Sequence, residues 1–235
     1  MRKTSRILLI SAVLLLLIPV FVVMAQLEDQ SEKLELVFEK MDKASRTFES
    51  FKADISTRKY TAVLEEFDPP ENGLYFYKRA GDGSALVRWE IKDPAEKITT
   101  IRNDEVTIYQ PKIKYANIYK LGKHRNKTEY LALGLGQAPS DLKEKYHITF
   151  KGGETINGDA CSILEFRPKD PEVASTFSSI TVWVKDVSGI STQMKLVEPY
   201  EDYLLVNFSN EKLNSKIDNS IFKQDLPGDV EVTSR

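Results

Sequence analysis

The sequence predicts a mainly β protein of the α+β class, in which about eleven antiparallel strands form one curled sheet. Three observations support this. Between residues 51 and 210, apolar side chains recur with a period of two, as in half-buried strands. Turn-forming pairs such as Asn157-Gly158 separate these segments at short intervals, and no gap is long enough to be a domain linker. A sheet of this size cannot stay flat, so we expect a barrel or half-barrel whose concave face is partly plugged by helices.

The first 25 residues have the pattern of a secretory signal peptide. Basic residues precede an almost wholly apolar run at residues 7–23, and Ala25 suits the position before a cleavage site. We therefore expect export, cleavage after Ala25, and a single domain over residues 26–235. The alternative is an uncleaved membrane anchor, although the apolar run lies at the lower limit of length for a span and contains Pro19.

One amphipathic helix is predicted ahead of the strands. Apolar residues recur three or four positions apart between Leu34 and Phe48, and Ser31 with nearby acidic residues suits a helix start, which together predict a helix over residues 30–49. Strands are predicted at residues 51–64, 73–79, 85–91, 97–102, 105–110, 115–120, 147–152, 160–167, 180–185, 191–197 and 203–210. Between the sixth and seventh strands, residues 126–133 and 140–146 have helical patterns.

Composition and motifs exclude several classes of function. The 33 basic and 35 acidic residues give a net charge of -2, which argues against non-specific electrostatic binding to nucleic acid. One cysteine and two histidines cannot make an internal disulfide or a Cys/His zinc site, and we expect Cys161 to be a small buried hydrophobe. No nucleophile elbow, zinc-protease motif or P-loop is present, so we expect no enzyme, no metal and no cofactor.

The feature that stands out is an excess of apolar residues on one face of the predicted sheet. In the strand at residues 85–91, for example, Val87, Trp89 and Ile91 alternate with the charged residues Arg88 and Glu90. The candidate inward-facing residues are Val87, Trp89, Ile91, Leu164, Phe166, Met194, Leu196, Leu204, Val206 and Phe208. They form either an ordinary core or the lining of a cavity for an apolar ligand such as acyl chains, and periodicity cannot separate the two.

The order of several motifs resembles the LolA-type periplasmic carriers of outer-membrane lipoproteins. After the amphipathic helix and a long strand, "GLYFYKR" at residues 73–79 and "VRWEI" at residues 87–91 are similar to successive strands of that family. "KITTIRNDEVTIYQP" at residues 97–111 is similar to its next hairpin, and "FKQDLPGDVEV" at residues 222–232 resembles its C-terminal Phe-x-x-x-x-Pro-x-x-Val ending. The resemblance covers almost the whole chain after residue 25.

This resemblance implies an unclosed β-barrel with a helical lid over an apolar cavity. It implies a monomeric periplasmic carrier that accepts lipoprotein acyl chains from an inner-membrane ATP-driven transporter and passes them to an outer-membrane acceptor. It also assigns Arg79 as a lock that holds the lid shut and Trp89 as a cavity residue. The chain departs from the family pattern after Arg79, where Ala80 replaces a proline and a Gly-rich insertion follows.

Other interpretations remain open from the sequence. Domains of the same fold include envelope sensors that bind lipid or a regulatory protein, and glycolipid carriers; a secreted enzyme of unknown type is the alternative from a different class. The polar stretch at residues 170–179 is longer than a hairpin turn requires, and it is predicted as a mobile loop near the cavity mouth.

Overall fold

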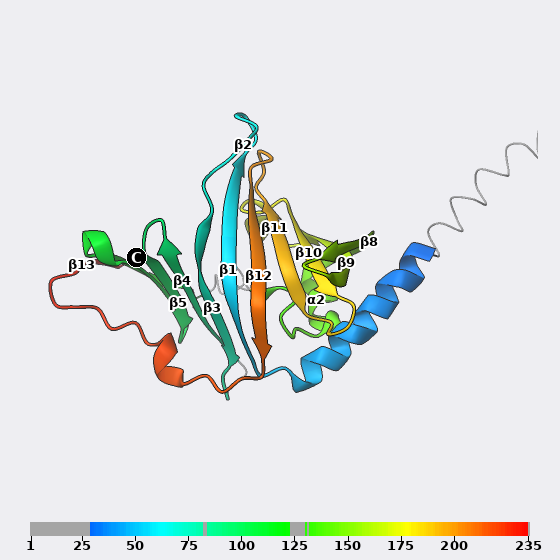
Figure 1. The fold of residues 1–235 in the computed structure, drawn as a ribbon, viewed down its shortest axis with the longest axis horizontal. Helices are drawn as coiled ribbons and strands as arrows, with labels where there is room; N and C mark the ends of the chain where they lie inside the picture. Colours follow the sequence, from blue (N-terminus) through cyan, green and yellow to red (C-terminus); the bar gives the residue numbers. More distant parts are fainter. Residues whose placement is uncertain (1–28, 82–83, 123–129, 131, 235) are drawn as a thin grey trace, which may run out of the picture.

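The computed structural model describes residues 29–81, 84–122, 130 and 132–234, and the predicted signal peptide lies outside these residues. Most of the described chain forms one 13-stranded sheet (Figure 1). Its order is β13-β7-β6-β5-β4-β3-β1-β12-β11-β10-β9-β8, with β2 paired to β1. The strands are β1 (Ser50–Thr61), β2 (Glu66–Phe67), β3 (Glu71–Arg79), β4 (Ala85–Asp93), β5 (Lys97–Arg102), β6 (Glu105–Gln110), β7 (Tyr115–Lys120), β8 (Tyr146–Ile156), β9 (Asp159–Pro168), β10 (Ser179–Lys185), β11 (Ser191–Val197), β12 (Tyr203–Leu213) and β13 (Glu231–Ser234).

The sheet curls but does not close. Neighbouring strands are antiparallel, as predicted, except for β13, which runs parallel to β7. Among the described residues, the end strands β13 and β8 do not pair with each other. The predicted fold class, a curled and unclosed antiparallel sheet with a few helices, is therefore confirmed.

A helix at residues 29–47 covers part of the inner face of the sheet, the face that carries Tyr75 and Val87. Val37, Phe38 and Met41 follow helical spacing, are at most 3% exposed, and join the main core cluster. The first two turns of the helix are largely exposed and extend away from the sheet (Figure 1). The helix predicted over residues 30–49 is confirmed within two residues at its C-terminal end.

The β10–β11 turn fixes the position of this helix. At Gly189, where φ is +68°, an added Cβ would lie 2.4 Å from the carbonyl oxygen of Lys40 in the helix. Only a residue without a side chain allows the two backbones to come so close in this left-handed conformation. Of the helices in the described residues, none has the length and apolar content needed to cross a membrane.

A second layer on the inner face comes from the loop at residues 132–138 and from helix α2 (Pro139–Lys145). Leu133, Leu135 and Leu142 are at most 2% exposed and belong to the same core cluster as the N-terminal helix. The backbone N–H of Ser191 on β11 donates to the carbonyl of Gly134, 3.0 Å away, which ties the loop to the sheet. Helix α2 confirms the prediction for residues 140–146, whereas most of the helix predicted at 126–133 falls outside the described residues.

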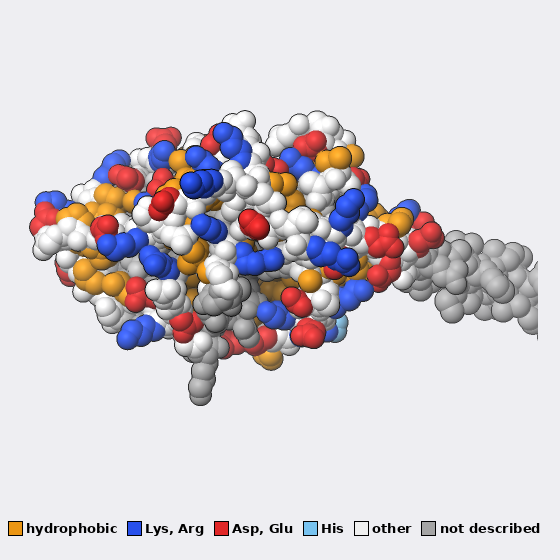
Figure 2. Space-filling view, turned by 90° about the horizontal axis from the view of Figure 1, so that it is seen from below, with side chains coloured by type: hydrophobic (Ala, Val, Ile, Leu, Met, Phe, Trp, Pro, Cys, Tyr) orange, Lys and Arg blue, Asp and Glu red, His pale blue; other side chains and the backbone are white. Residues whose placement is uncertain are grey.

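The C-terminal segment covers the outer face of the other half of the sheet. Ile217 and Phe222, the latter in the 3-10 helix η3 (Asn219–Phe222), pack against Phe76 and Leu86. Further along, Leu226 and Val230 pack on a small cluster formed by Ile98, Tyr109 and Ala116, before β13 joins the sheet edge. Figure 2 shows basic and acidic side chains mixed over the lower face of the molecule, with hydrophobic side chains visible between them.

Three predictions about elements need correction. Thirteen strands replace the predicted eleven, because β2 and β13 are too short for an alternating pattern to be recognised. Strand β1 ends at Thr61 rather than at residue 64, since the chain turns there into β2. The segment predicted as a loop at residues 170–179 contains helix α3 (Pro171–Ala174), where the Asp170 side chain caps the helix by accepting from the backbone N–H of Glu172.

Candidate functional site

A cavity lies on the inner face between strands β3 to β5 and the layer formed by the loop and α2. It has a volume of about 640 Å³, within the range of small-molecule sites. Its apolar lining comprises Tyr77, Ala85, Val87, Ile101, Leu121, Ala132, Ala138, Leu142 and Tyr146. Its polar lining comprises Ser45, Arg79, Ser84, Asn103, Asp104, Gly136, Gln137, Asp141 and Lys145. A lining that mixes apolar and polar residues suits a ligand that has a hydrocarbon part and a polar head.

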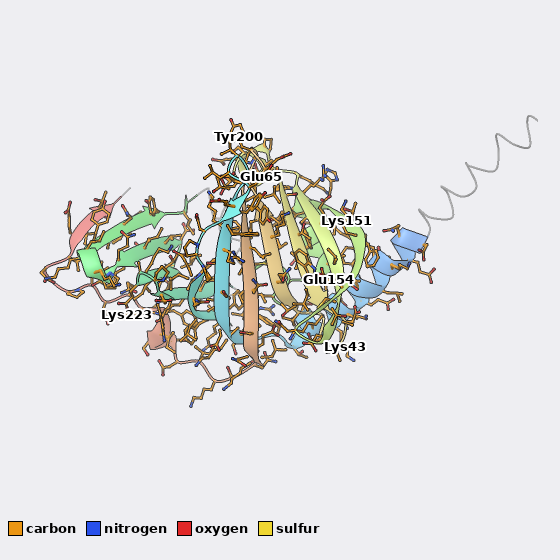
Figure 3. All side chains as sticks on the ribbon, turned by 45° about the horizontal axis from the view of Figure 1, so that its top comes forward. Lys43, Glu65, Lys151, Glu154, Tyr200 and Lys223 are labelled. Carbon is orange, nitrogen blue, oxygen red and sulfur yellow. The ribbon has the colours of Figure 1, made fainter. Side chains whose placement is uncertain are left out.

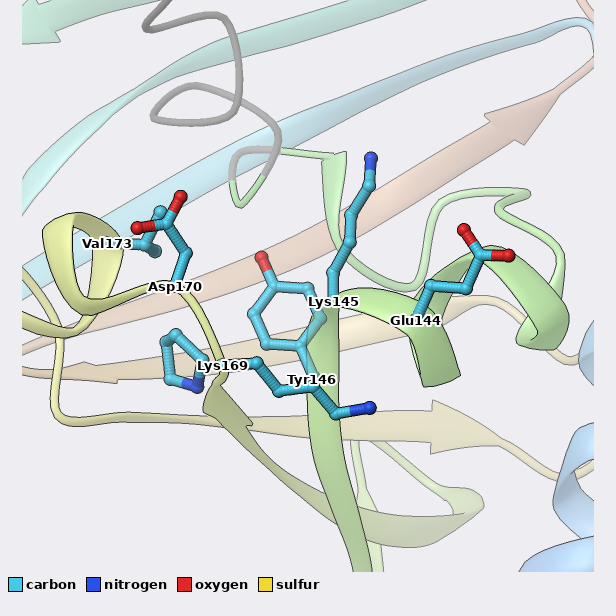
Figure 4. A pocket seen from close by; sticks show the side chains of 7 residues that line it. Glu144, Lys145, Tyr146, Lys169, Asp170 and Val173 are labelled. Carbon is cyan, nitrogen blue, oxygen red and sulfur yellow. The ribbon is translucent and has the colours of Figure 1, made fainter.

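A smaller hollow of about 300 Å³ adjoins this cavity (Figure 4). Lys145 and Tyr146, at the junction of α2 and β8, line both spaces. Val173 of α3 and Pro168 complete its apolar part, and Asp170 stands at its border. The segment at residues 170–179 therefore lies next to the main cavity, as predicted, but it includes a capped helix.

Arg79 joins three parts of the structure at one end of the cavity. Its backbone N–H donates to the carbonyl of Glu49, 2.8 Å away, just beyond the N-terminal helix. Its guanidinium donates to the carbonyl of Gly136 in the loop at 2.9 Å and to the carbonyl of Ser45 in the last turn of the helix at 3.4 Å. The side chain thus ties both inner layers to the end of β3, and a planar fork of donors suits two such carbonyls.

The surroundings of Arg79 are shaped to allow these contacts. Gly136 has a φ of +69°, and a Cβ there would lie 2.2 Å from the Phe48 ring, so glycine alone fits. Phe48 packs against Tyr77 with 5.5 Å between ring centroids. Burial raises the pKa of the Tyr77 hydroxyl, while the nearby charge of Arg79 acts in the opposite direction. The phenol is therefore neutral at physiological pH, and Arg79 is the charged group on this side of the ring pair.

The ten residues predicted to line a cavity are distributed between the cavity and the core. Val87 lines the 640 Å³ cavity and, at 2% exposed, also belongs to the main core cluster. Six others are at most 2% exposed in the core cluster that includes the N-terminal helix: Leu164, Phe166, Met194, Leu196, Val206 and Phe208. Trp89 and Leu204 are partly buried against this cluster, and Ile91 is 1% exposed. The N-terminal helix therefore contributes to the cluster that holds most of the predicted lining residues.

Trp89 has a feature that its neighbours lack. Its indole Nε1 is buried and has no hydrogen-bond partner in the part of the chain that is described. The ring makes an edge contact with Tyr75 at 6.2 Å between centroids. A buried donor without an acceptor costs about 1–3 kcal/mol. It is therefore available to a ligand that brings a carbonyl to the inner face.

Several cavity residues were not identified from the sequence. Tyr77 and Ile101 alternate with residues of the outer face, so strand periodicity could have included them. The contribution of Gly136, a backbone carbonyl, has no sequence signal beyond the need for glycine. Asp104 and Asp141 lie far apart in the chain, and only the folded sheet brings them to the same cavity.

The fold and the cavity together define a class of protein. A curled sheet whose inner face is covered by a helix and a hydrogen-bonded loop, with a cavity between them, suits a protein that binds a ligand with an apolar part. Residues 84–225 match the family model described as "Outer membrane lipoprotein carrier protein LolA". The chain belongs to this LolA family, and it is a binding protein rather than an enzyme.

Two relatives are similar to the chain in sequence, and a solved structure is similar to it in fold. The outer-membrane lipoprotein carrier protein of Pseudomonas fluorescens strain Pf0-1 is 23% identical over 181 residues, covering 75% of this chain and 82% of the relative. The protein of the same name from Pseudomonas putida strain W619 is 26% identical over 160 residues, covering 68% and 69%. An uncharacterized conserved protein from Thermus thermophilus has a similar fold, with a TM-score of 0.52 at 11% identity, covering 86% of this chain and 99% of that one.

Proposed function

We propose that this protein binds the acyl chains of lipoproteins and carries them through the periplasm from the inner to the outer membrane. The observation that carries the proposal is the family match combined with the hydrogen bonds from Arg79 to the helix and the loop. The cargo is received from an inner-membrane ATP-driven transporter and delivered to an outer-membrane acceptor, with the protein acting as a monomer. It needs no metal or cofactor for this task.

In the proposed mechanism the helix and loop compete with the cargo for the inner face. Burying a sixteen-carbon chain is worth about 12 kcal/mol, at about 0.8 kcal/mol for each CH₂ group. A carrier that gained all of this could not release its cargo. Because Val37, Phe38 and Met41 already fill the inner face, a bound chain must displace them and recovers only the difference in free energy.

We further propose that the ten predicted residues line the enlarged cavity of the loaded state. Val87 and the 640 Å³ space give the chain its entry point. The core residues Leu164, Phe166 and Phe208 become ligand contacts as the helix moves. The buried N–H of Trp89 can then donate to a carbonyl near the head of the acyl chain.

Tryptophan fluorescence tests this proposal, because the chain has two tryptophans on opposite faces of the sheet. Adding a palmitoyl-chain probe is expected to shift the emission of Trp89, and Trp89→Ala should remove most of that shift. Trp183 lies on the outer face, where its Nε1 donates to Glu154 at 2.7 Å. Trp183→Ala is the matched control and should retain the shift. Absence of probe binding to the parent protein would remove the main support for a carrier.

Export is a separate part of the proposal. We expect the mature protein to begin at Gln26, since the apolar run at residues 7–23 ends just before Ala25. N-terminal sequencing of protein from the envelope fraction measures this directly. A membrane-held protein that begins at Met1 would instead establish an anchor.

A further inference from the structure

Two turns form an exposed apolar projection at one end of the sheet. The turn after β1, at residues 62–65, lies beside the β11–β12 turn at residues 198–202; Figure 1 shows both turns at the top, and Figure 3 labels Glu65 and Tyr200 there. We call its four large apolar side chains the apolar tip. They are Val63, Leu64, Phe67 and Tyr200, which are 87%, 65%, 37% and 89% exposed.

Hydrogen bonds and an ion pair hold the two turns together. The backbone N–H of Ala62 donates to the Asp202 carboxylate at 2.8 Å, and the Lys59 ammonium pairs with Glu198 at 3.1 Å. Within the second turn, the N–H of Glu198 donates to the carbonyl of Asp202 at 2.7 Å. The exposed side chains are therefore presented on an ordered platform.

An aromatic group supports the tip from below. Tyr60 and Tyr203 stack with 4.7 Å between centroids, and Phe67 packs edge-on against Tyr60 at 5.1 Å. The Arg58 guanidinium lies 4.3 Å from the centroid of the Phe67 ring. Tyrosines with an apolar body and a polar end are enriched where membranes meet water. Val63 and Leu64, in the turn that follows Tyr60 in the chain, are the more exposed at 87% and 65%.

We propose that the apolar tip inserts into the surface of a zwitterionic lipid bilayer that presents ammonium headgroups. Four side chains on two narrow turns and the short strand β2 do not make a flat patch of the roughly 800 Å² that each partner contributes to a stable protein interface. A lipid surface needs no preformed socket, because it deforms around a projection. The inference rests on the proposed function, since a lipid carrier must come to a membrane.

The charges around the tip select the kind of lipid. Six acidic residues stand on the two turns or next to them: Glu65, Glu66, Asp68, Glu198, Glu201 and Asp202. The nearby basic residues are Arg58, Lys59 and Lys195, and Lys59 is already paired with Glu198. Carboxylates attract the primary ammonium of phosphatidylethanolamine, whereas an anionic surface such as phosphatidylglycerol repels them.

The tip lies at the opposite end of β1 from Arg79. Strand β1 pairs with β3 from Ser50, next to Arg79, as far as Thr57, and then continues to Thr61 at the tip. Twelve residues of strand span roughly 36 Å. Substitutions at the tip can therefore be tested without altering the contacts that close the cavity.

Vesicle flotation tests the inference. The triple variant Val63→Ser, Leu64→Ser, Tyr200→Ser is compared with the double variant Ile113→Ser, Val187→Ser, which removes exposed hydrophobics elsewhere (66% and 89% exposed). The parent and the control should float with vesicles of phosphatidylethanolamine and phosphatidylcholine, and the triple variant should bind at least tenfold less. Replacing phosphatidylcholine by phosphatidylglycerol should weaken binding of the parent.

Three outcomes would overturn the inference: no flotation of the parent, an equal loss in the control, or stronger binding to anionic vesicles. Impaired cargo transfer by the triple variant without any vesicle binding would identify a protein partner instead.

Thermal unfolding checks that each variant is folded. Binding of a palmitoyl-chain probe in detergent-free solution is measured in parallel. If the parent binds no probe, the proposed function fails whatever the flotation assay shows. If the triple variant binds the probe normally but does not float with vesicles, the apolar tip acts only in binding the protein to the membrane.

Discussion

Replacing Arg79 with leucine is expected to leave the protein loaded with lipid and slow to release it. The substitution removes the donors to the carbonyls of Gly136 and Ser45, which hold the loop and the helix to the end of β3. Losing partners for buried carbonyls costs about 1–3 kcal/mol. A change of this size shifts the balance between closed and open states by about 5- to 150-fold. The helix and the loop then compete less strongly with the cargo for the inner face of the sheet.

Two measurements check this result. Lipid extracted from purified protein and weighed against protein mass gives the occupancy, and transfer of a labelled lipoprotein to acceptor vesicles gives the rate of release. Arg79→Lys keeps the charge but not the planar fork, so its values should lie between those of the parent and Arg79→Leu. Arg167→Leu is the control, because that side chain is 65% exposed and pairs with Glu165 on the surface. Equal occupancy and transfer for parent and Arg79→Leu would show that Arg79 is not a lock.

The hairpins of the sheet could be predicted from the sequence because turn-forming residues mark the ends of their strands. Strands β5, β6, β7 and β11 begin and end at the predicted residues. Between β5 and β6, Asn103 and Asp104 both adopt positive φ, as expected for residues chosen for a tight hairpin. Local alternation and local turn chemistry are sufficient here, since each strand pairs with its neighbour in the chain.

Elements that depend on distant contacts could not be predicted in this way. Strand β13 pairs with β7 across more than a hundred residues, and its four residues carry no recognisable alternation. The C-terminal segment folds over the outer face because Phe222 meets Phe76 and Leu86, a contact that no local pattern encodes.

In the candidate site, too, local sequence patterns predicted some features, whereas others depend on contacts between distant parts of the chain. The sequence resemblance pointed to Arg79, and the folded chain supplies carbonyl partners for its guanidinium from a loop and a helix that are far away in sequence. Alternation placed Val87 and Phe208 on one face of the sheet. It could not indicate that Val87, which is in the same core cluster as Phe208, also lines a cavity, because both environments require apolar residues.

Phe208→Ala is expected to cause a large loss of stability that an acyl ligand partly restores. Phe208 is 1% exposed and makes ring contacts with Phe51 at 5.4 Å and Tyr75 at 5.3 Å. Removing a buried phenylalanine ring costs about 3–5 kcal/mol and leaves a hollow among apolar neighbours. Such a hollow binds apolar molecules rather than water. If acyl chains enter this part of the inner face, they will fill it.

The comparison with Phe222→Ala makes the experiment specific. Phe222 is also 1% exposed, but it belongs to the small cluster on the outer face. Both variants should lose several kcal/mol of unfolding free energy in denaturant titrations. A saturating palmitoyl-chain probe stabilises whichever folded form binds it, in proportion to the logarithm of the affinity. The probe should therefore raise the melting temperature of Phe208→Ala more than that of the parent, and that of Phe222→Ala no more than that of the parent. Equal gains for both variants would place the acyl chain somewhere other than beneath the N-terminal helix.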